Sequence, residues 1–146
     1  MKKYNKFGAK KIEWRGLKFD SKVELETYIL LLSYQDENKI VELQKIDKGF
    51  VLEDLGYYNV NSKKKKIRDV TYKPDLKFYA IDAEIFGYKF KHKNVIVEVK
   101  GEATAKLTDY KIRRRLFIKK YLDEHTVFLE VILSRNGKKT VLWEKI

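Results

Sequence analysis

The sequence predicts one mixed α/β domain, and three observations lead to this class. The chain has 146 residues, which suits a single hydrophobic core. Apolar residues recur with helical or strand periodicity, in the order helix, strands, helix, strands. The chain has a single proline, no internal repeat and no linker-like stretch. We therefore expect residues 12–146 to form the domain, with the basic residues 1–11 as a loose arm.

The first half of the chain predicts a hairpin, a helix and two strand pairs. Residues 12–14 and 17–19 flank Arg15-Gly16, which is typical of a tight turn. Asp20-Ser21 then opens a helix that continues to the polar residues 35–39. Four short strands are expected next: 40–43 and 50–52 around a turn at 47–49, then 57–60 and 67–72 joined by the lysine-rich loop 61–66.

The second half predicts a longer sheet and a second helix. The expected elements are a strand over 75–81 with a hairpin partner over 84–90, a strand over 94–100 ended by Gly101, a helix over 108–122 with Thr108 as N-cap, and strands over 126–134 and 140–144 around Asn136-Gly137.

The charge of the chain indicates a polyanionic partner. Lysine and arginine number 33 against 21 acidic residues, giving a formal net charge of +12. Such an excess favours phosphate contacts through counterion release. The basic residues also cluster, at 2–11, 63–68 and 111–120. We therefore predict nucleic acid as the partner, rather than a membrane surface, because no basic segment has a long apolar face.

Several classes of protein are excluded by what the sequence lacks. The absence of cysteine excludes disulfides, thiol nucleophiles and cysteine-based zinc sites. His92 and His125 have no neighbours that suit a Ser–His–Asp or HExxH site. No apolar run is long enough to cross a bilayer, and no secretory signal is recognisable. We expect an intracellular, cytoplasmic protein without a membrane partner.

The strand over 94–100 carries two charged residues in an apolar setting. Alternation places Ile96, Glu98 and Lys100 on one face. On an exposed edge these would be ordinary solvated residues. The strand is apolar enough to be central, however, and a carboxylate and an ammonium there must be paired or bound to something. Both lie near the C-terminal end, where α/β sheets usually place their sites.

A second carboxylate, Asp75, follows Pro74 at the start of another strand. Alone it would be a turn aspartate. Converging with Glu98, it would supply the oxygen ligands that Mg²⁺ prefers. Such an ion lowers the pKa of a bound water and shields a scissile phosphate. Lys100 would position the water or stabilise developing negative charge.

These motifs resemble the PD-(D/E)XK nuclease superfamily. Pro74-Asp75 is followed, after a hairpin, by Glu98-Val99-Lys100, and residues 16–24 resemble the "FDSKxE" opening of a small phage-encoded family in it. The resemblance spans roughly residues 15–120, through discontinuous motifs that also include 40–44 and 110–112. The order of elements is similar to that of phage Holliday-junction resolving endonucleases. The resemblance implies a restriction-endonuclease-like mixed β-sheet flanked by helices.

The resemblance also implies roles for individual residues. Asp75 and Glu98 would be metal ligands and Lys100 the catalytic lysine, with Mg²⁺ as cofactor and Mn²⁺ as a substitute. Glu24 would complete the metal site, although Ser21 to Glu24 also fits a capping box. Gln44 matches a family position of less certain role. Two acidic residues between the motifs, Asp82 and Glu84, are interpreted as part of a hairpin extension that could instead displace a named ligand.

The basic clusters supply the expected DNA contacts. In the second helix Leu116, Phe117 and Tyr121 are expected to pack on the sheet, with the basic residues facing outward. The predicted contacts are Lys106, Lys111, Arg113, Arg114 and Arg115 around this helix, and Lys63, Lys64, Lys65 and Lys66 in the lysine-rich loop.

We therefore expect a Mg²⁺-dependent DNA endonuclease. By resemblance its substrate would be branched or recombination DNA such as a Holliday junction, its source a phage acting in the host cytoplasm, and its assembly a homodimer. A nuclease for duplex or single-stranded ends, or for RNA, is the alternative within this class. A non-catalytic nucleic-acid-binding module on the same fold is the alternative outside it.

Overall fold

A computed structural model describes residues 11–146 and confirms a single mixed α/β domain with three helices and a five-stranded mixed sheet. The order in the main sheet is β11-β10-β9-β8-β3, and β9 and β10 are its parallel pair. Its strands are β3 (Ile40–Lys45), β8 (Leu76–Ile85), β9 (Tyr88–Gly101), β10 (Thr126–Ser134) and β11 (Gly137–Trp143). The expected N-terminal basic segment, residues 1–11, lies almost wholly outside the described residues.

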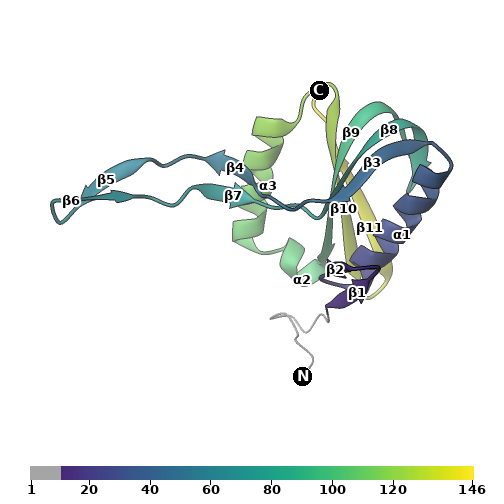
Figure 1. Ribbon diagram of the computed structural model, residues 1–146, viewed down its shortest axis with the longest axis horizontal. Coiled ribbons are helices and arrows are strands. Elements are labelled where there is room, and N and C mark those ends of the chain that lie inside the picture. The colour runs from purple at the N-terminus through teal and green to yellow at the C-terminus, as the bar shows by residue number, and fades with distance from the viewer. Residues whose placement is uncertain (1–10) are drawn as a thin grey trace.

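The helices form layers on the two faces of this sheet (Figure 1). The helix α1 (Lys22–Asp36) covers one face, while α2 (Glu102–Ala105) and α3 (Thr108–Tyr121) cover the other. Ser21 is the N-cap of α1, as one of the two sequence readings required, and its hydroxyl accepts a hydrogen bond from the Glu24 backbone. The predicted N-cap of α3 is wrong, because Thr108 is already helical and Leu107 precedes it.

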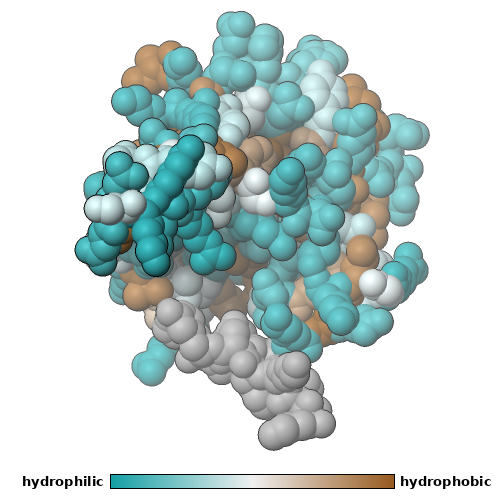
Figure 2. Space-filling view, turned by 60° about the vertical axis from the view of Figure 1, so that its left-hand side comes forward, coloured by the Kyte–Doolittle hydropathy of each residue, from teal (hydrophilic) through white to brown (hydrophobic). Residues whose placement is uncertain are grey.

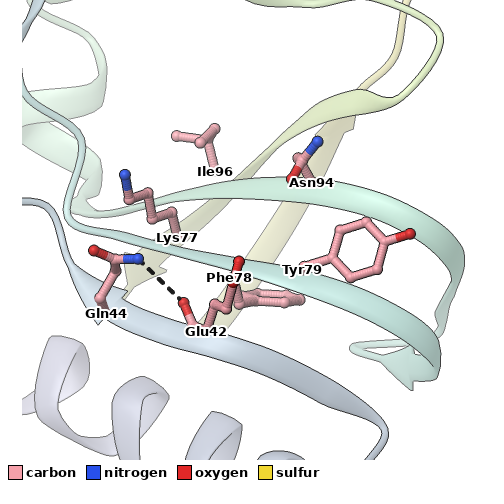
Figure 3. A pocket seen from close by; sticks show the side chains of 7 residues that line it. All are labelled: Glu42, Gln44, Lys77, Phe78, Tyr79, Asn94 and Ile96. Atoms are coloured by element: carbon pink, nitrogen blue, oxygen red, sulfur yellow. Dashed lines mark hydrogen bonds between the residues drawn. The ribbon is translucent and has the colours of Figure 1, made fainter.

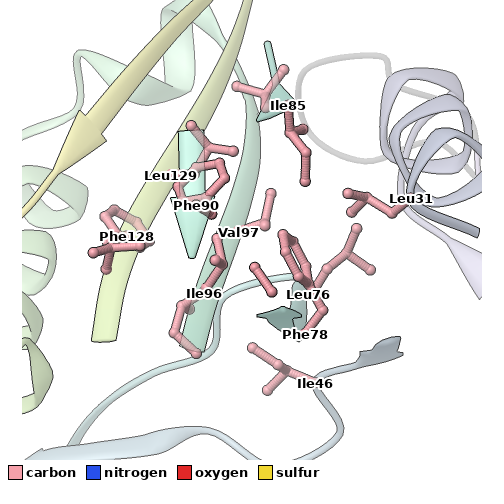
Figure 4. Close-up of a cluster of buried hydrophobic side chains, with 14 of the residues drawn as sticks. Leu31, Ile46, Leu76, Phe78, Ile85, Phe90, Ile96, Val97, Phe128 and Leu129 are labelled. Atoms are coloured by element: carbon pink, nitrogen blue, oxygen red, sulfur yellow. The ribbon is translucent and has the colours of Figure 1, made fainter. Parts of the chain in front are cut away.

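The core lies mainly between α1 and the sheet (Figure 4). Its largest fully buried side chains come from both layers: Phe19, Leu31, Ile40, Leu76, Ile85, Phe90, Val95, Val97 and Leu129. The opposite face holds Phe128, against which Phe117 of α3 packs with ring centroids 5.4 Å apart. This second contact fixes α3 beside the C-terminal end of β9, where Glu98 and Lys100 lie.

Three two-stranded ribbons complete the fold. They are β1 (Ile12–Trp14) with β2 (Leu17–Phe19), β4 (Phe50–Glu53) with β7 (Val70–Tyr72), and β5 (Tyr57–Val60) with β6 (Lys63–Lys66). The first confirms the predicted hairpin: Arg15 and Gly16 both have positive φ, as a type I′ turn requires. The other two form a long projection from the body, seen at the left of Figure 1.

The strand pairings in this projection differ from the prediction. The predicted partners 40–43 and 50–52 belong to different sheets, because β3 pairs with β8 and β4 pairs with β7. The predicted loop 61–66 is mostly strand β6, and only Asn61 and Ser62, both with positive φ, make the turn. Lysine has a low strand propensity, so a run of four gave no strand signal.

No helix in the described part of the chain is both long enough and apolar enough to span a membrane.

Candidate metal centre and basic cleft

Asp75 lies at the meeting point of two groups of charged residues. On the α1 side, one ligand atom each of Asp20, Glu24 and Asp75 lie within 4.8 Å of one another. On the β9 side, the Val99 N–H donates to Asp75 Oδ2 at 2.7 Å. A backbone hydrogen bond adjoins this side-chain contact, because the Asp75 N–H donates to the Val97 carbonyl. These bonds hold the carboxylate beside the strand segment that carries Glu98.

Glu98 is buried and only half satisfied. Its side chain is 2% exposed, and Oε1 lies 2.7 Å from Lys100 Nζ. Oε2 is buried with no hydrogen-bond partner, and the same is true of the neighbouring Tyr72 hydroxyl. Buried polar atoms without partners are rare in folded proteins, and each invites a ligand or an ion as explanation. Unsatisfied carboxylate oxygen is what a hard divalent cation requires.

The electrostatics of the three inner carboxylates point the same way. Burial and the neighbouring Asp75 charge raise the pKa of Glu24 to about 7. Burial and the Glu98 charge raise the pKa of Asp75 well above its usual range. Burial also raises the pKa of Glu98, against the opposing charge of Lys100. In each case burial is the largest cause, and a nearby positive charge would lower the pKa again.

The Glu24 carboxylate lies both at the start of α1 and within the acidic group. Its Oε2 accepts a hydrogen bond from the Asp20 backbone N–H at 2.9 Å, one residue before the expected capping-box partner. Its Oε1 lies 3.8 Å from Lys45 Nζ, and the carboxylate belongs to the group with Asp20 and Asp75. Glu24 is thus both part of the helix start and part of the candidate centre.

Two site residues were missed by the sequence reasoning. Asp20 was named only at the start of the first helix, yet its carboxylate joins the acidic group. Lys45 was not considered, and Gln44 was named in its place. Gln44 is exposed, donates weakly to the Glu42 carbonyl and lines a hollow with Lys77 and other residues outside the acidic group (Figure 3).

A bulge in β3 explains why Lys45, and not Gln44, faces the acidic group. The register shifts between Val41 and Gln44, and Glu42 has a φ of 58°. Two residues therefore oppose one residue of β8, and every later side chain changes face. Lys45 pairs with the inward-facing Leu76, while Gln44 pairs with Lys77.

A cleft with basic walls opens beside Lys100. It lies between β7, the end of β9 and α3, and we name it the basic cleft. Its cationic side chains are Lys73, Lys100 and Arg113, against one acidic residue, Asp109. Tyr72 and Tyr110 form part of its wall. Lys100 Nζ lies 4.7 Å from the centre of the Tyr110 ring, and Arg113 donates to the Thr71 carbonyl. The arrangement would accommodate a phosphate backbone next to Glu98.

The predicted DNA contacts of α3 divide into outward and inward residues. Lys111 and Arg115 are accessible on this helix, and Lys106 is exposed with Glu102 at 3.3 Å. Arg114 is a correction: it faces inward and lies 3.2 Å from the buried Glu130. Leu116 is also a correction, because it is 37% exposed rather than packed on the sheet.

The inward positions of α3 have a spacing that explains both corrections. Tyr110, Arg114, Phe117 and Tyr121 follow one another at helical intervals of three or four residues. An arginine within this stripe is hidden from sequence reasoning, because its carboxylate partner lies on a distant strand. The remaining acidic candidates, Asp82 and Glu84, are exposed and face Lys91 and Lys89 across the β8–β9 hairpin, so neither displaces a named ligand in the acidic group.

Residues 3–134 match the model of a family described as "Protein of unknown function (DUF1064)". The chain belongs to this family. Comparison with curated proteins and with solved structures found no match. The family description names no activity, so the argument for function rests on the site.

Proposed function

We propose that the protein is a divalent-metal-dependent nuclease that hydrolyses phosphodiester bonds in DNA, on a fold of the PD-(D/E)XK kind. The observation that carries the proposal is the buried, partnerless Oε2 of Glu98, whose carboxylate contacts Lys100 of the basic cleft and whose charge acts on Asp75 of the Asp20–Glu24–Asp75 group. A structural ion pair would need no open oxygen. A metal site that faces a phosphate-binding surface would.

The residues present fit a hard cation. Asp75 and Glu98 would hold Mg²⁺ or Mn²⁺, with Glu24 and Asp20 completing the oxygen donors. When bound, the ion would lower the pKa of a water and neutralise charge on the phosphate.

The chain's own side chains would do the remaining work. Lys73 and Arg113 would bind phosphates in the basic cleft. Lys100, held by Glu98 and the Tyr110 ring, would donate hydrogen bonds to the reacting phosphate or orient the attacking water. Tyr72 and Tyr110 would exclude bulk water from this side of the site.

A panel of labelled substrates tests the proposal. The panel contains a four-way junction, a flap, a linear duplex, a single strand and RNA, each with Mg²⁺, Mn²⁺ or EDTA. We expect metal-dependent cleavage by the wild type, and binding without cleavage by Asp75→Asn and Lys100→Ala. Preference for the junction would support the branched-DNA substrate that the sequence resemblance implies, and sedimentation would test the expected homodimer.

The chain offers matched controls for both variants. Asp82 lies on β8, which begins directly after Asp75, and Lys91 lies on β9, as Lys100 does, but Asp82 and Lys91 face each other toward the far end of the hairpin. Asp82→Asn and Lys91→Ala should cut as the wild type does. Binding of DNA with no cleavage of any substrate in either metal would overturn the nuclease proposal and favour a binding module.

A further inference from the structure

The projection formed by β4 to β7 is the feature of this molecule that the metal centre and basic cleft do not explain. Its outer part, residues 57–66, is here named the arm. The arm contains four lysines and no acidic residue. All eight residues of β5 and β6 are exposed, including Tyr57 at 61% and Tyr58 at 57%. No arm side chain contributes to the core.

The arm is a defined projection, because its base is firmly attached to α3. Phe50 packs against Phe117 and Tyr121, with ring centroids 5.2 and 4.9 Å apart. The Lys120 ammonium and the Tyr121 hydroxyl both donate to the Val51 carbonyl, at 2.9 and 2.7 Å. The base continues through β7 into Lys73 and Asp75, so the arm extends from the edge of the candidate site.

The middle of the projection is also stabilised. The Ile67 N–H donates to the Gly56 carbonyl at 2.8 Å, and the Gly56 N–H donates to Asp54 at 2.9 Å. Lys66 lies 3.1 Å from Asp69 and 3.6 Å from Asp54. Lys66 is thus paired within the chain. Lys63, Lys64 and Lys65 form no ion pair with any described residue.

The three unpaired lysines lie on both faces of the ribbon. The register pairs Lys64 with Asn59 on the face that carries Tyr57, whose ring centre is 4.8 Å from Lys64 Nζ. Lys63 and Lys65 pair with Val60 and Tyr58 on the other face. A flat anionic surface would be met by one face only. A ribbon with cations on both faces fits between two walls of phosphate.

We infer that the arm inserts as a two-stranded ribbon into the major groove of duplex DNA beside the segment held at the candidate site. The major groove is about 12 Å wide and admits a two-stranded β-ribbon. The major groove of A-form RNA is too narrow and deep for this. The face of the molecule that carries the arm, turned forward in Figure 2, is predominantly hydrophilic. The inference deepens the proposed function and rests on its premise that the substrate is DNA, but it does not require cleavage.

The test compares two triple variants that lose the same charge. One is Lys63→Gln/Lys64→Gln/Lys65→Gln. The control, Lys89→Gln/Lys91→Gln/Lys145→Gln, changes three exposed lysines away from the arm. Both are made in the Asp75→Asn background and measured in EDTA, so that bound DNA stays intact. Circular dichroism should show that both are folded, because none of the six side chains is buried.

We expect the arm variant to bind a blunt duplex at least about tenfold more weakly than the control. The slope of log affinity against log salt should fall by about 2.7, since each phosphate contact contributes about 0.9. The arm variant should no longer protect guanine N7 from dimethyl sulfate, whereas the control should, because N7 lines the major groove. Equal affinity and slope for the two variants would overturn the inference, as would an equal loss on single-stranded DNA.

The inference and the proposed function fail in different ways. Cleavage is measured separately, with Mg²⁺ and the wild-type Asp75. Arm-dependent duplex binding without cleavage of any substrate would support the inference and overturn the nuclease proposal. Metal-dependent cleavage by the wild type, with normal duplex binding by the arm variant, would support the nuclease proposal and overturn the inference.

Discussion

Two buried glutamates on adjacent strands differ in how many hydrogen-bond partners their carboxylates have. Glu98 on β9 and Glu130 on β10 are partners in the parallel register and are 2% and 1% exposed. Glu130 is fully engaged: it accepts hydrogen bonds from the Tyr110 hydroxyl at 2.5 Å and the Trp143 indole at 2.5 Å, and Arg114 lies at 3.2 Å. Glu98 has Lys100 on one oxygen, and its other oxygen makes no hydrogen bond of regular geometry, although the Tyr72 and Asp75 side chains lie beside it.

The difference teaches that burial of a carboxylate does not by itself indicate function. Both groups carry the cost of leaving water, and both are reached by a cation. Of the two carboxylates, only Glu130 has both oxygens satisfied by groups from its own fold, although Arg114 Nε in the same network is buried without a partner. The open oxygen of Glu98, not its burial, is the feature that suggests an external ligand.

The largest expected effect is the loss of activity in Glu98→Gln. We expect cleavage to fall by about a thousandfold or more, since several kcal/mol of charge stabilisation would be lost. Thermal stability without metal should fall by less than in Glu130→Gln, because the charge of Glu98 contacts Lys100 alone, whereas the charge of Glu130 is held by three donors. Single-turnover cleavage and a melting curve in EDTA measure activity and stability. A loss of stability as large as that of Glu130→Gln would make Glu98 structural, like Glu130.

Glu130→Gln should give the opposite result. Removing the charge leaves Arg114 partly buried without its partner, at a cost of about 3 kcal/mol in the free energy of unfolding. Urea denaturation measures this loss. The variant Glu130→Gln/Arg114→Met should recover part of it, since both charges are then gone. At a temperature where the single variant is folded, its cleavage rate should stay close to that of the wild type.

The pH dependence of stability should separate the two regions next. The pKa of Glu24 is raised to about 7 in the folded protein, so its contribution to stability without metal is full below about 4.5 and is lost as pH rises through 7. Asp75 and Glu98 shift in the same direction. Stabilisation by Mg²⁺ should accordingly be larger at pH 8 than at pH 5.5. Melting curves with Mg²⁺ and with EDTA test this, and Glu24→Gln should flatten the difference.

The smallest effects are expected in β3. Gln44→Ala should cut within about twofold of the wild type, because the side chain faces away from the acidic group. Lys45→Ala should shift the pH–rate profile to higher pH, since the Lys45 charge lowers the pKa of Glu24. The two profiles, measured over the same pH range, decide which residue belongs to the site. A shift with Gln44→Ala alone would contradict the bulge argument.

Much of the fold could be predicted from local pattern. The two long helices, the central strand with Glu98 and Lys100, and the turn at Arg15-Gly16 each have a signal within a few neighbouring residues. Strand pairing has no such signal. β4 and β7 pair with each other although the whole arm separates them in the sequence, and β4 packs against α3.

The candidate site was partly predictable for the same reason. Asp75, Glu98 and Lys100 have a sequence motif, and the structure places Glu98 and Lys100 in contact, with Asp75 beside them. Lys45 and Arg114 could not be assigned, because one depends on a bulge and the other on a carboxylate of a distant strand. Both errors concern which way a side chain faces, and tertiary context decides that.

The start of α1 has a consequence for how the protein would be loaded in a cell. Ser21 and Glu24 satisfy backbone donors at the helix N-terminus using atoms of the chain alone. The start of this helix therefore needs no ion to satisfy these two donors. Free magnesium would then act on finished molecules, reversibly, and synthesis of the protein and readiness to cut would be controlled independently.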